Sequence, residues 1–210
     1  MERNLVIGAS GGIGAAMCAA LGGQVVGVSR QGDGLDVTDV ASVARVLGGL
    51  EAGFDRILVA FGVLGTPEKS LSAIDGDEMA RVMAVNTIGV GLILHHMPRL
   101  LAKSGRVGVL TARVGSIGDN RLGGWHSYRA SKAAANQLIR GAAIELSRTH
   151  KGSVVAALHP GTVDTPFTAG YKAQKLSPEA SATKLIAVLD GLSADQTGGF
   201  FDYSGAEVPW

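Results

Sequence analysis

The chain has 210 residues, of which 46% are hydrophobic and 18% charged, and this composition excludes a disordered chain. The formal net charge is +1 without a basic cluster, so neither nucleic acid nor an anionic membrane is expected as a partner. Glycine is unusually common, at 31 residues, but the lack of a Gly-x-y repeat and the 6 prolines exclude a collagen-like chain. We therefore expect a compact domain whose backbone often turns sharply or approaches another group closely.

Two features bear on where the protein resides. Cys18 is the only cysteine, so no internal disulfide can form, and this is typical of a reducing, cytoplasmic compartment. Residues 5–29 carry no charge, but seven of these 25 residues are glycine, and two apolar runs flank a segment of small residues. That pattern indicates strand, turn, helix and strand. We therefore expect neither a signal peptide nor a membrane span there.

Short apolar runs alternate with longer helical patterns along the whole chain. Strands are predicted at residues 5–8, 25–29, 57–60, 106–110, 154–158 and 199–201, with a very short one near Leu35. Helices are predicted at residues 12–21, 40–47, 77–101, 127–150 and 178–192. This order predicts βαβ units and a parallel sheet covered on both faces, without a second domain. The irregular insertions are expected at residues 62–75, 113–126 and 166–177.

A glycine-rich turn connects the first predicted strand to the first predicted helix. Gly8, Gly12 and Gly14 follow the spacing G-x-x-x-G-x-G. Such a turn lets backbone N–H groups and the helix dipole hold a phosphate, although a tight strand–helix turn without a ligand is the alternative. The predicted cofactor contacts of this turn are Gly8, Ser10, Gly11, Gly12, Ile13 and Gly14.

The residues after the second predicted strand bear on the choice of cofactor. Many NAD sites place an acid there, whereas this chain has Ser29 and Arg30. An arginine suits the 2′-phosphate of NADP by charge and by shape, so NADP(H) is favoured over NAD(H). A solvated surface arginine is the alternative. Asp36 and Val37, after the next short strand, are candidates for the adenine end.

Tyr128 and Lys132 are four residues apart at the start of a predicted helix, so they share one helix face. A free phenol has a pKa near 10 and is a poor base at neutral pH, but a neighbouring ammonium favours the phenolate. Such a tyrosine can exchange a proton with a carbonyl or carbinol oxygen while a hydride moves at carbon. A lone Tyr-x-x-x-Lys is common by chance, so the interpretation depends on the accompanying motifs.

These motifs occur together and in one order along the chain. They are the glycine turn, Asn86, the run Tyr128-Arg-Ala-Ser-Lys132, and the run Pro160-Gly161-Thr-Val163-Asp-Thr165. Together they resemble the short-chain dehydrogenase/reductase family over essentially the whole chain. The spacing of residues 115–128 and the run 128–133 are similar to the subgroup of sniffer-like carbonyl reductases and C-factor proteins.

The resemblance implies a single-domain α/β Rossmann fold over residues 1–210, with built-in substrate loops. Its doubly wound parallel sheet would have about seven strands, with helices on both faces. Tyr128 would be the catalytic acid/base, Lys132 would bind the nicotinamide ribose and lower the pKa of Tyr128, and Asn86 would hold a water of the proton relay. The remaining implied cofactor contacts are Ala60, Gly62, Thr111, Pro160, Gly161, Val163 and Thr165.

One departure affects the catalytic set. The family usually places a serine that hydrogen-bonds the substrate oxygen where this chain has Ala112. Ser116, just past a turn glycine, is the favoured replacement and is included among the catalytic residues. Thr111 is the second candidate, although on a strand its side chain points to the other face. The third possibility is that no hydroxyl substitutes. A second departure is Ala60, where the family commonly has asparagine.

The function implied is an NADP(H)-dependent oxidoreductase acting on a small-molecule carbonyl or secondary alcohol. The alternative is a non-catalytic nucleotide-binding or signalling protein on the same fold. Residues 166–177 are expected to form a lid, with a plain solvated loop as the alternative. Trp125 and Phe167 are expected to add an apolar pocket wall, with packing as the alternative.

Neither a metal nor a monomer is expected. His95 and His96 are adjacent on a helix and point different ways, and no histidine or cysteine spacing matches a zinc site. The helix from Ser127 is rich in small residues, and in the family this helix and the one bearing Asn86 often form dimer faces. We therefore expect a homodimer or homotetramer, with packing inside the chain as the alternative.

Overall fold

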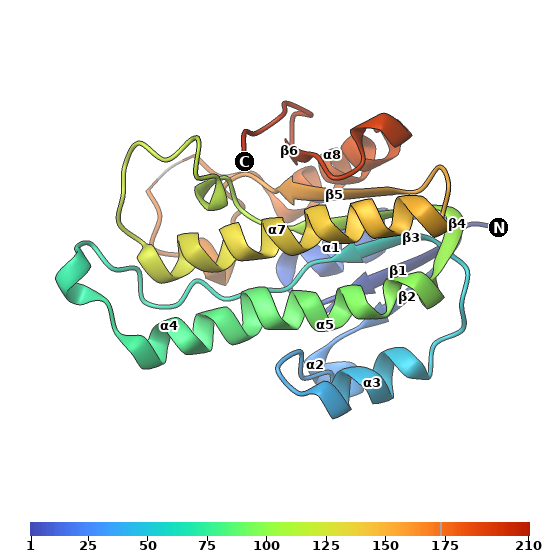
Figure 1. The fold of residues 1–210 in the computed structure, drawn as a ribbon, viewed down its shortest axis with the longest axis horizontal. Helices are drawn as coiled ribbons and strands as arrows, with labels where there is room; N and C mark the ends of the chain where they lie inside the picture. Colours follow the sequence, from blue (N-terminus) through green and yellow to red (C-terminus); the bar gives the residue numbers. More distant parts are fainter. Residues whose placement is uncertain (173) are drawn as a thin grey trace.

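A computed structural model describes residues 1–172 and 174–210, and its centre is a sheet of six parallel strands (Figure 1). The strand order is β2-β1-β3-β4-β5-β6, and each neighbouring pair is parallel. The strands are β1 (Arg3–Ile7), β2 (Gln24–Val28), β3 (Phe54–Val59), β4 (Leu101–Leu110), β5 (Val154–His159) and β6 (Phe200–Asp202).

Helices cover both faces of the sheet, as the alternating order predicts. In Figure 1, α3, α4, α5 and α7 lie on the near face, and α1 and α8 pack together on the far face. Among the described helices, none is both long and apolar enough to cross a membrane. The helices are α1 (Gly12–Ala20), α2 (Arg30–Asp33), α3 (Val40–Gly48), α4 (Gly76–Met83), α5 (Gly89–His95), α6 (Met97–Leu100), α7 (His126–Thr149) and α8 (Pro178–Gly191).

The strands are apolar throughout because each of their faces is covered. Leu5 and Ile7 of β1 belong to the core under α3, α5 and α7, whereas Val6 belongs to the core under α1 and α8. Successive strand residues point to opposite faces, so both sets must be apolar. Burial of each such side chain contributes about 1.5–3 kcal/mol. The two cores together fix the sheet between its helix layers.

The carboxyl ends of the parallel strands meet at one edge of the sheet, at the left of Figure 1. Helix α7 runs antiparallel to the strands, so its first turn lies at this same edge. In open α/β sheets, ligands bind outside the carboxyl ends of the strands. The fold therefore brings the start of α7, the glycine turn after β1 and the loops after β3, β4 and β5 to one edge.

The sheet has six strands rather than about seven, because the segment near Leu35 forms no strand. Gly34 adopts a left-handed φ of 65° and ends α2, and the N–H of Leu35 then returns to the carbonyl of Ser29 at 3.2 Å. The chain folds back on itself at this point instead of extending along β2. Leu35 is buried, so its apolar character reflects the core under α3 and not a strand.

The predicted helix over residues 77–101 is divided in the structure. The π-helical segment η2 (Ala84–Ile88) joins α4 to α5, and a break at His96 precedes α6. Pro98 lies in the first turn of α6, where helix N–H groups have no partner within the helix, so the missing N–H of proline costs nothing there. The same missing donor prevents α5 from continuing through this position. Strand β4 then begins at Leu101, five residues earlier than predicted, with a register shift against β3 between Phe54 and Arg56.

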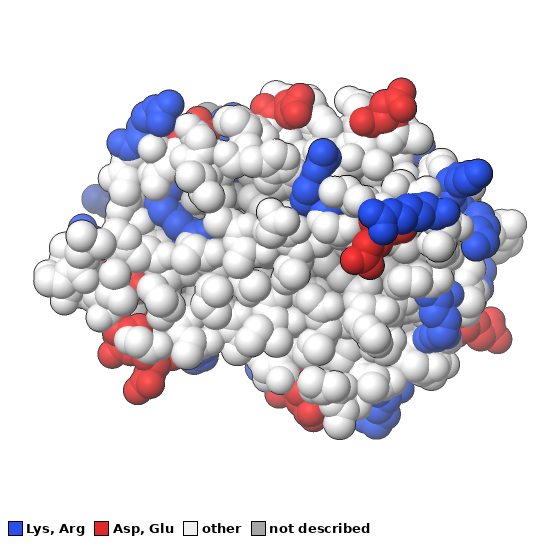
Figure 2. Space-filling view, viewed as in Figure 1, with Lys and Arg blue, Asp and Glu red and all other residues white. Residues whose placement is uncertain are grey.

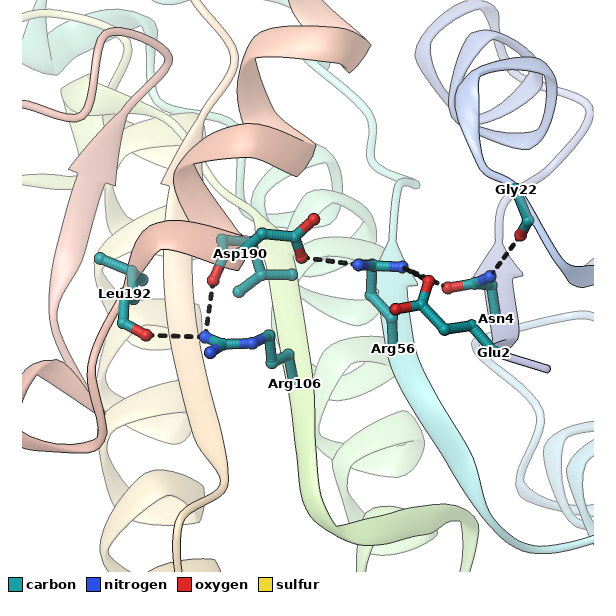
Figure 3. A network of polar contacts seen from close by, with 8 residues as sticks. Glu2, Asn4, Gly22, Arg56, Arg106, Asp190 and Leu192 are labelled. Atoms are coloured by element: carbon teal, nitrogen blue, oxygen red, sulfur yellow. Dashed lines mark hydrogen bonds and ion pairs between the residues drawn. The ribbon is translucent and has the colours of Figure 1, made fainter.

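A polar network ties the opposite, amino-terminal edge of the sheet together (Figure 3). Arg56 of β3 is only 9% exposed, and it donates to Asp190 of α8 at 2.7 and 2.9 Å and to the fully buried Asn4 of β1 at 2.6 Å. Asn4 in turn donates to the carbonyl of Gly22 at 2.9 Å. Arg106 of β4 donates to carbonyls at the end of α8. These groups join three strands to the end of α8.

We expect Arg56→Leu to lower the free energy of unfolding by about 1–3 kcal/mol, because it leaves the buried carboxamide oxygen of the Asn4 side chain without its donor. Urea denaturation measures this loss. The matched control is Arg148→Leu, since Arg148 is exposed on α7 and its replacement should change stability by less than about 0.5 kcal/mol. Equal stability of the two variants would show that the network contributes nothing.

Candidate active site

Close contacts within the chain require glycine at three positions of the glycine turn. Gly8 has a φ of +97°, and a Cβ there would lie 2.6 Å from the carbonyl oxygen of Ala60. A Cβ on Gly14 would collide with the carbonyl oxygen of Gly8, and one on Gly12 would lie 2.7 Å from Cγ2 of Thr165. The turn, the end of β3 and the loop after β5 are therefore in direct contact. Three of the predicted cofactor segments thus meet at one place.

The amino terminus of α1 is open to a ligand. Gly11 is its N-cap, and no side chain in the described part of the chain caps the helix. The first-turn N–H groups of a helix have no acceptor within the helix, and the helix dipole adds partial positive charge there. Gly11 and Gly12 are exposed, and Ser10 beside them is exposed as well. These groups fit a pyrophosphate, which needs backbone donors and no side chain in the way.

The end of β2 carries an acid that the sequence pattern did not reveal. Ser29 caps α2, and its own N–H donates to a carboxylate oxygen of Asp33 at 2.8 Å. Asp33 lies four residues after Ser29 and therefore returns to the strand end where many NAD sites hold an acid. Arg30 begins α2 and is exposed. A positive and a negative side chain thus lie at the same strand end.

Asp36 and Val37 follow α2 and differ in their surroundings, since Asp36 is exposed and Val37 is half-buried. The hydroxyl and N–H of Thr38 both bond to the Asp36 carboxylate, at 2.7 and 2.9 Å, and lower its pKa, with a smaller contribution from Arg30. Val37 is half-buried and packs against α5, where a Cβ on Gly89 would lie 3.0 Å from the valine side chain. Asp36 is exposed and ionised, whereas Val37 contributes mainly to the core.

Tyr128 and Lys132 lie in the first two turns of α7, and both are almost fully buried. Nζ of Lys132 is 5.9 Å from the centre of the Tyr128 ring, and it donates to the carbonyl of Leu110 at the end of β4 at 3.3 Å. A Cβ on Gly62 would lie 3.3 Å from this ammonium, and one on Gly115 would lie 2.7 Å from Cβ of Lys132. Glycine at both positions lets the surrounding backbone close on the lysine.

Burial dominates the protonation of this pair. It lowers the pKa of Lys132 to about 8 and raises the pKa of Tyr128 above its ordinary value near 10, with the Tyr171 phenol adding to the second effect. The lowered tyrosine pKa that the resemblance implies is thus not found for the pair alone, because desolvation of a phenolate outweighs the pull of one ammonium. At neutral pH the lysine is charged and the phenol keeps its proton.

Asn86 holds the first turns of α7 against the loop after β3. It lies in the π-helical segment η2 and is fully buried. Its carboxamide accepts from the N–H of Val63 at 2.8 Å and donates to the carbonyl of Val63 at 2.8 Å and to Oγ of Ser131 at 3.0 Å. Both N–H groups of this amide and its oxygen bond within the protein, so its side chain holds the loop that carries Gly62 against α7. Its role in holding a water stays a prediction.

Glu68 is a site residue that sequence reasoning missed. Its carboxylate is buried and accepts from the N–H and the hydroxyl of Ser127, the residue before Tyr128, while its carbonyl accepts from the N–H of Trp125 at 2.7 Å. Burial alone would raise the pKa of Glu68, but the bonds from Ser127 lower it overall. No local motif signals this contact, because Glu68 and Ser127 are 59 residues apart in the sequence.

The loop after β5 closes the edge of the sheet. Gly161 has a φ of +79° and faces the ring of Tyr203, and Val163 is buried and pairs with Leu176 in an isolated bridge. The carbonyl of Pro160 accepts from the hydroxyl of Ser181 on α8 at 2.9 Å. The predicted lid starts with the short helix η4 (Pro166–Thr168), and residue 173 within it lies outside the described residues.

Comparison with known proteins identifies the family. A family model described as enoyl-(acyl carrier protein) reductase matches residues 8–188, most of the chain. The chain belongs to the short-chain dehydrogenase/reductase family. A curated relative, the 1-hydroxy-2-glutathionyl-2-methyl-3-butene dehydrogenase of Rhodococcus sp. (strain AD45), is 35% identical over 182 residues, covering 84% of this chain and 79% of the relative. The C-signal protein of Myxococcus xanthus is 37% identical over 143 residues, covering 67% and 84%.

Solved structures share the fold over the full length. A short-chain dehydrogenase/reductase of Burkholderia multivorans, solved with bound NADP, superposes with a TM-score of 0.85 at 27% identity, covering 100% of this chain and 99% of that one. The carbonyl reductase Sniffer of D. melanogaster superposes with a TM-score of 0.87 at 20% identity, covering 100% of both chains, and this likeness concerns the fold alone. The Rossmann fold expected from the sequence is confirmed.

The short-chain dehydrogenase/reductase motif is incomplete at Ala112, and the structure shows where the neighbouring hydroxyls lie. Ser116 is buried, donates to the carbonyl of Pro209 and accepts from the N–H of Asp119 at 3.0 Å. Thr111 donates to the carboxamide oxygen of Asn136 at 2.7 Å. Both hydroxyls are engaged within the protein, so neither one is poised to replace the serine. The involvement of Ser116 in catalysis stays a prediction that this arrangement does not support.

Proposed function

We propose that this protein is an NADP(H)-dependent oxidoreductase that interconverts a small-molecule carbonyl and a secondary alcohol. The observation that carries the proposal is the burial of Tyr128 and Lys132 side by side at the carboxyl edge of the sheet. The uncapped amino terminus of α1 lies at that edge too, in contact with the loop after β5 through Gly12 and Thr165. A proton-transferring group and a phosphate cradle therefore share one site.

The residues of this edge fit a nicotinamide cofactor, which supplies the hydride and, when oxidised, a positively charged ring. The backbone at Gly11–Gly14 would hold the pyrophosphate, and Lys132 would reach the adjoining ribose. Ala60 and Gly62 lie between the glycine turn and Lys132, since Ala60 adjoins Gly8 and Gly62 adjoins the lysine ammonium. The other proposed contacts are Gly8, Ser10, Ile13, Ser29, Arg30, Asp36, Val37, Thr111, Tyr128, Pro160, Gly161, Val163 and Thr165.

Tyr128 would donate its proton to the carbonyl oxygen during reduction and accept it during oxidation. In reduction, a neutral phenol is the required form, and burial keeps the phenol neutral at physiological pH. In oxidation the phenolate is needed, and the charge of Lys132 favours it. Glu68, Asn86 and Ser131 hold the first turns of α7, so the phenol oxygen has a fixed position relative to the edge of the sheet.

We expect Tyr128→Phe to lower kcat for carbonyl reduction by at least about 100-fold, because a positioned acid typically contributes 10²- to 10⁴-fold. The dissociation constant for NADPH should change little, since the ring that packs in the site remains. Steady-state NADPH oxidation with a panel of aldehydes and ketones and NADPH fluorescence titration measure the two effects. Tyr203→Phe, which removes a phenol oxygen outside the Tyr128–Lys132 pair, is the control. Equal rates for Tyr128→Phe and the natural chain would refute the mechanism.

Cofactor choice depends on the balance between Arg30 and Asp33. The NADP in the Burkholderia multivorans structure supports NADP for this chain, and Arg30 supplies a guanidinium at the right strand end. Asp33 opposes a 2′-phosphate because its carboxylate bonds to the N–H of Ser29 at that same end. The preference for NADPH is therefore expected to be moderate and to rest on Arg30.

We expect Arg30→Ala to weaken NADPH binding by about tenfold, the loss of one charge-assisted contact, and to leave NADH binding nearly unchanged. Asp33→Asn should have the opposite effect on NADPH, because it keeps the acceptor for Ser29 and removes the negative charge. Isothermal titration of each variant with NADPH and with NADH gives its dissociation constants relative to the natural chain. A parallel loss of NADPH and NADH affinity in Arg30→Ala would contradict a contact with the 2′-phosphate.

A non-catalytic nucleotide-binding role is the second candidate. It is favoured by Ala112, which cannot donate to a substrate oxygen, and by the engagement of Thr111 and Ser116 within the protein. Tight binding of NADPH without turnover of any carbonyl or alcohol on the panel would favour this role. The cytoplasmic location expected from the single cysteine stays a prediction under either function.

We also propose that the protein is a homo-oligomer that associates through α7 and the helices beside it. Figure 2 shows a broad uncharged area on the face where Figure 1 places α4, α5 and α7. Ile88 and Ile144 on this side of the fold are 55% and 47% exposed. A Cβ on Gly141 of α7 would meet no atom within 4 Å, so packing inside the chain does not require glycine there. A second copy would cover these positions.

We expect the double variant Ile88→Glu with Ile144→Glu to be a monomer, because like charges would meet across the proposed interface. Light scattering on a sizing column measures the mass of each species. Leu122→Glu is the control, since Leu122 is 90% exposed in the loop after β4 and lies outside the helices of the proposed interface. The proposal fails if the natural chain is itself monomeric, or if the double variant keeps the mass of the oligomer.

A further inference from the structure

Aromatic side chains are concentrated around Tyr128, although the chain has few of them. The chain has only 2 tryptophans, 3 tyrosines and 5 phenylalanines, yet four of these ten form one continuous cluster. The Tyr128 ring centre lies 5.9 Å from that of Phe167 and 6.3 Å from that of Trp125, and Trp125 lies 5.6 Å from Tyr171. Trp125, Phe167 and Tyr171 are here called the aromatic wall. They come from two loops that meet over the start of α7.

Trp125 is placed in the wall by an unusual backbone. Its φ is 53°, and Gly123 and Gly124 before it also have left-handed φ values of 63° and 65°. Among the described residues, Trp125 is the sole residue other than glycine with a positive φ. Bulky residues adopt this conformation at a conformational cost, and such residues concentrate at functional sites. Packing alone could have used a regular helix start, so the strained turn indicates that the position of the indole matters.

The strained turn is held from outside its own segment. The carbonyl of Glu68 accepts from the N–H of Trp125 at 2.7 Å, and Arg129 donates to the carbonyl of Gly124 at 3.0 Å. Glu68 also caps α7 through Ser127, so the indole and the Tyr128 ring are fixed to the same group. The distance between the indole and the Tyr128 ring is therefore set by the fold and not by a flexible loop.

Four charged side chains of the loops after β3, β4 and β5 and of the start of α7 bond to other groups of the protein. The guanidinium of Arg129 is bonded to two backbone carbonyls, and the carboxylate of Glu68 is bonded to Ser127. Arg113 pairs with Asp119 at 3.1 Å, and Lys175 pairs with Asp164 at 3.2 Å. Phe167 is 37% exposed, and Trp125 and Tyr171 are half-buried, so the rings keep surface that a ligand can cover. The ring surfaces beside Tyr128 are thus apolar, and they are inclined to one another by 47° to 61°.

We propose that the substrate carbonyl carries a flat, apolar group, such as an aryl ring, which lies against Trp125 and Phe167 while the oxygen faces Tyr128. This substrate class rests on the proposed oxidoreductase function. Ring contacts of this kind favour aryl over charged substituents, because a carboxylate placed against a ring face would lose water that the ring does not replace. Carboxylated aldehydes are therefore expected to be poor substrates.

Substrate preference tests the proposal first. We expect kcat/KM with NADPH to be at least about tenfold higher for benzaldehyde than for succinic semialdehyde, which corresponds to a modest difference in transition-state contact. Trp125→Ala and Phe167→Ala should each lower kcat/KM for benzaldehyde about tenfold, mainly through KM, and change that for propanal less than about twofold. The matched control is Trp210→Ala, at a 41%-exposed tryptophan outside the wall.

A binding measurement keeps the test independent of turnover. The chain has two tryptophans, so Trp210→Phe leaves Trp125 as the sole indole, and Trp125→Phe leaves Trp210. In the presence of NADP⁺, 2-naphthol is expected to quench the indole fluorescence saturably in Trp210→Phe and not in Trp125→Phe. Thermal unfolding confirms that each variant is folded.

The possible outcomes separate this proposal from the proposed function. Turnover that favours succinic semialdehyde, or equal losses for benzaldehyde and propanal in Trp125→Ala, would overturn the substrate class and leave the oxidoreductase intact. No turnover of any carbonyl, together with naphthol quenching specific to Trp125, would refute the oxidoreductase and retain the aromatic site. Absence of Trp125-specific quenching overturns the aromatic site whatever the activity.

Discussion

Burial of the Lys132 ammonium is the constraint on which the rest of the site depends. Lys132 is 3% exposed, and within the described residues its ammonium bonds to the carbonyl of Leu110, so the charge has lost most of its hydration. A buried charge is costly unless its surroundings compensate it, and the lowered pKa of about 8 expresses that cost. The proposed cofactor ribose would offer further acceptors. Cofactor binding would therefore compensate part of the free energy lost by burying this charge.

The residues around the lysine are those that let the chain close on it. Gly62 leaves room for the lysine ammonium, and Gly115 leaves room for the lysine Cβ. A Cβ on Gly115 would lie 2.7 Å from that of Lys132 and would require the helix to shift. Asn86 fixes the loop that carries Gly62, and Ser131 links this amide to the carbonyl of Tyr128. Glu68 holds the same helix from its amino terminus. Tyr128 is fixed as a consequence, because it lies one turn from the lysine on a helix that cannot shift.

The glycines divide into those that the fold requires and those that stay available to a ligand. Gly8 and Gly14 are required by contacts within the chain, whereas Gly11 is exposed at the open end of α1. The polar network of Arg56 stabilises the opposite edge of the sheet, far along the strands from the site (Figure 3). Stability and chemistry are thus assigned to different edges of one sheet, which is the usual division in parallel α/β folds.

The sequence by itself determined the family, the parallel sheet and the pairing of Tyr128 with Lys132. These follow from local periodicity and from motif order, since residues four apart on a helix share a face and apolar runs of a few residues form buried strands. Only the tertiary structure decided the hydrogen-bond partners of Ser116, the return of Asp33 to the end of β2 and the capping of α7 by Glu68. The missing strand near Leu35 belongs to the same group. The partners of Ser116 and Glu68 depend on segments far apart in the sequence, which no local pattern encodes. Asp33 and Leu35 instead follow from the short helix α2 and its left-handed end at Gly34, which the hydrophobic pattern does not reveal.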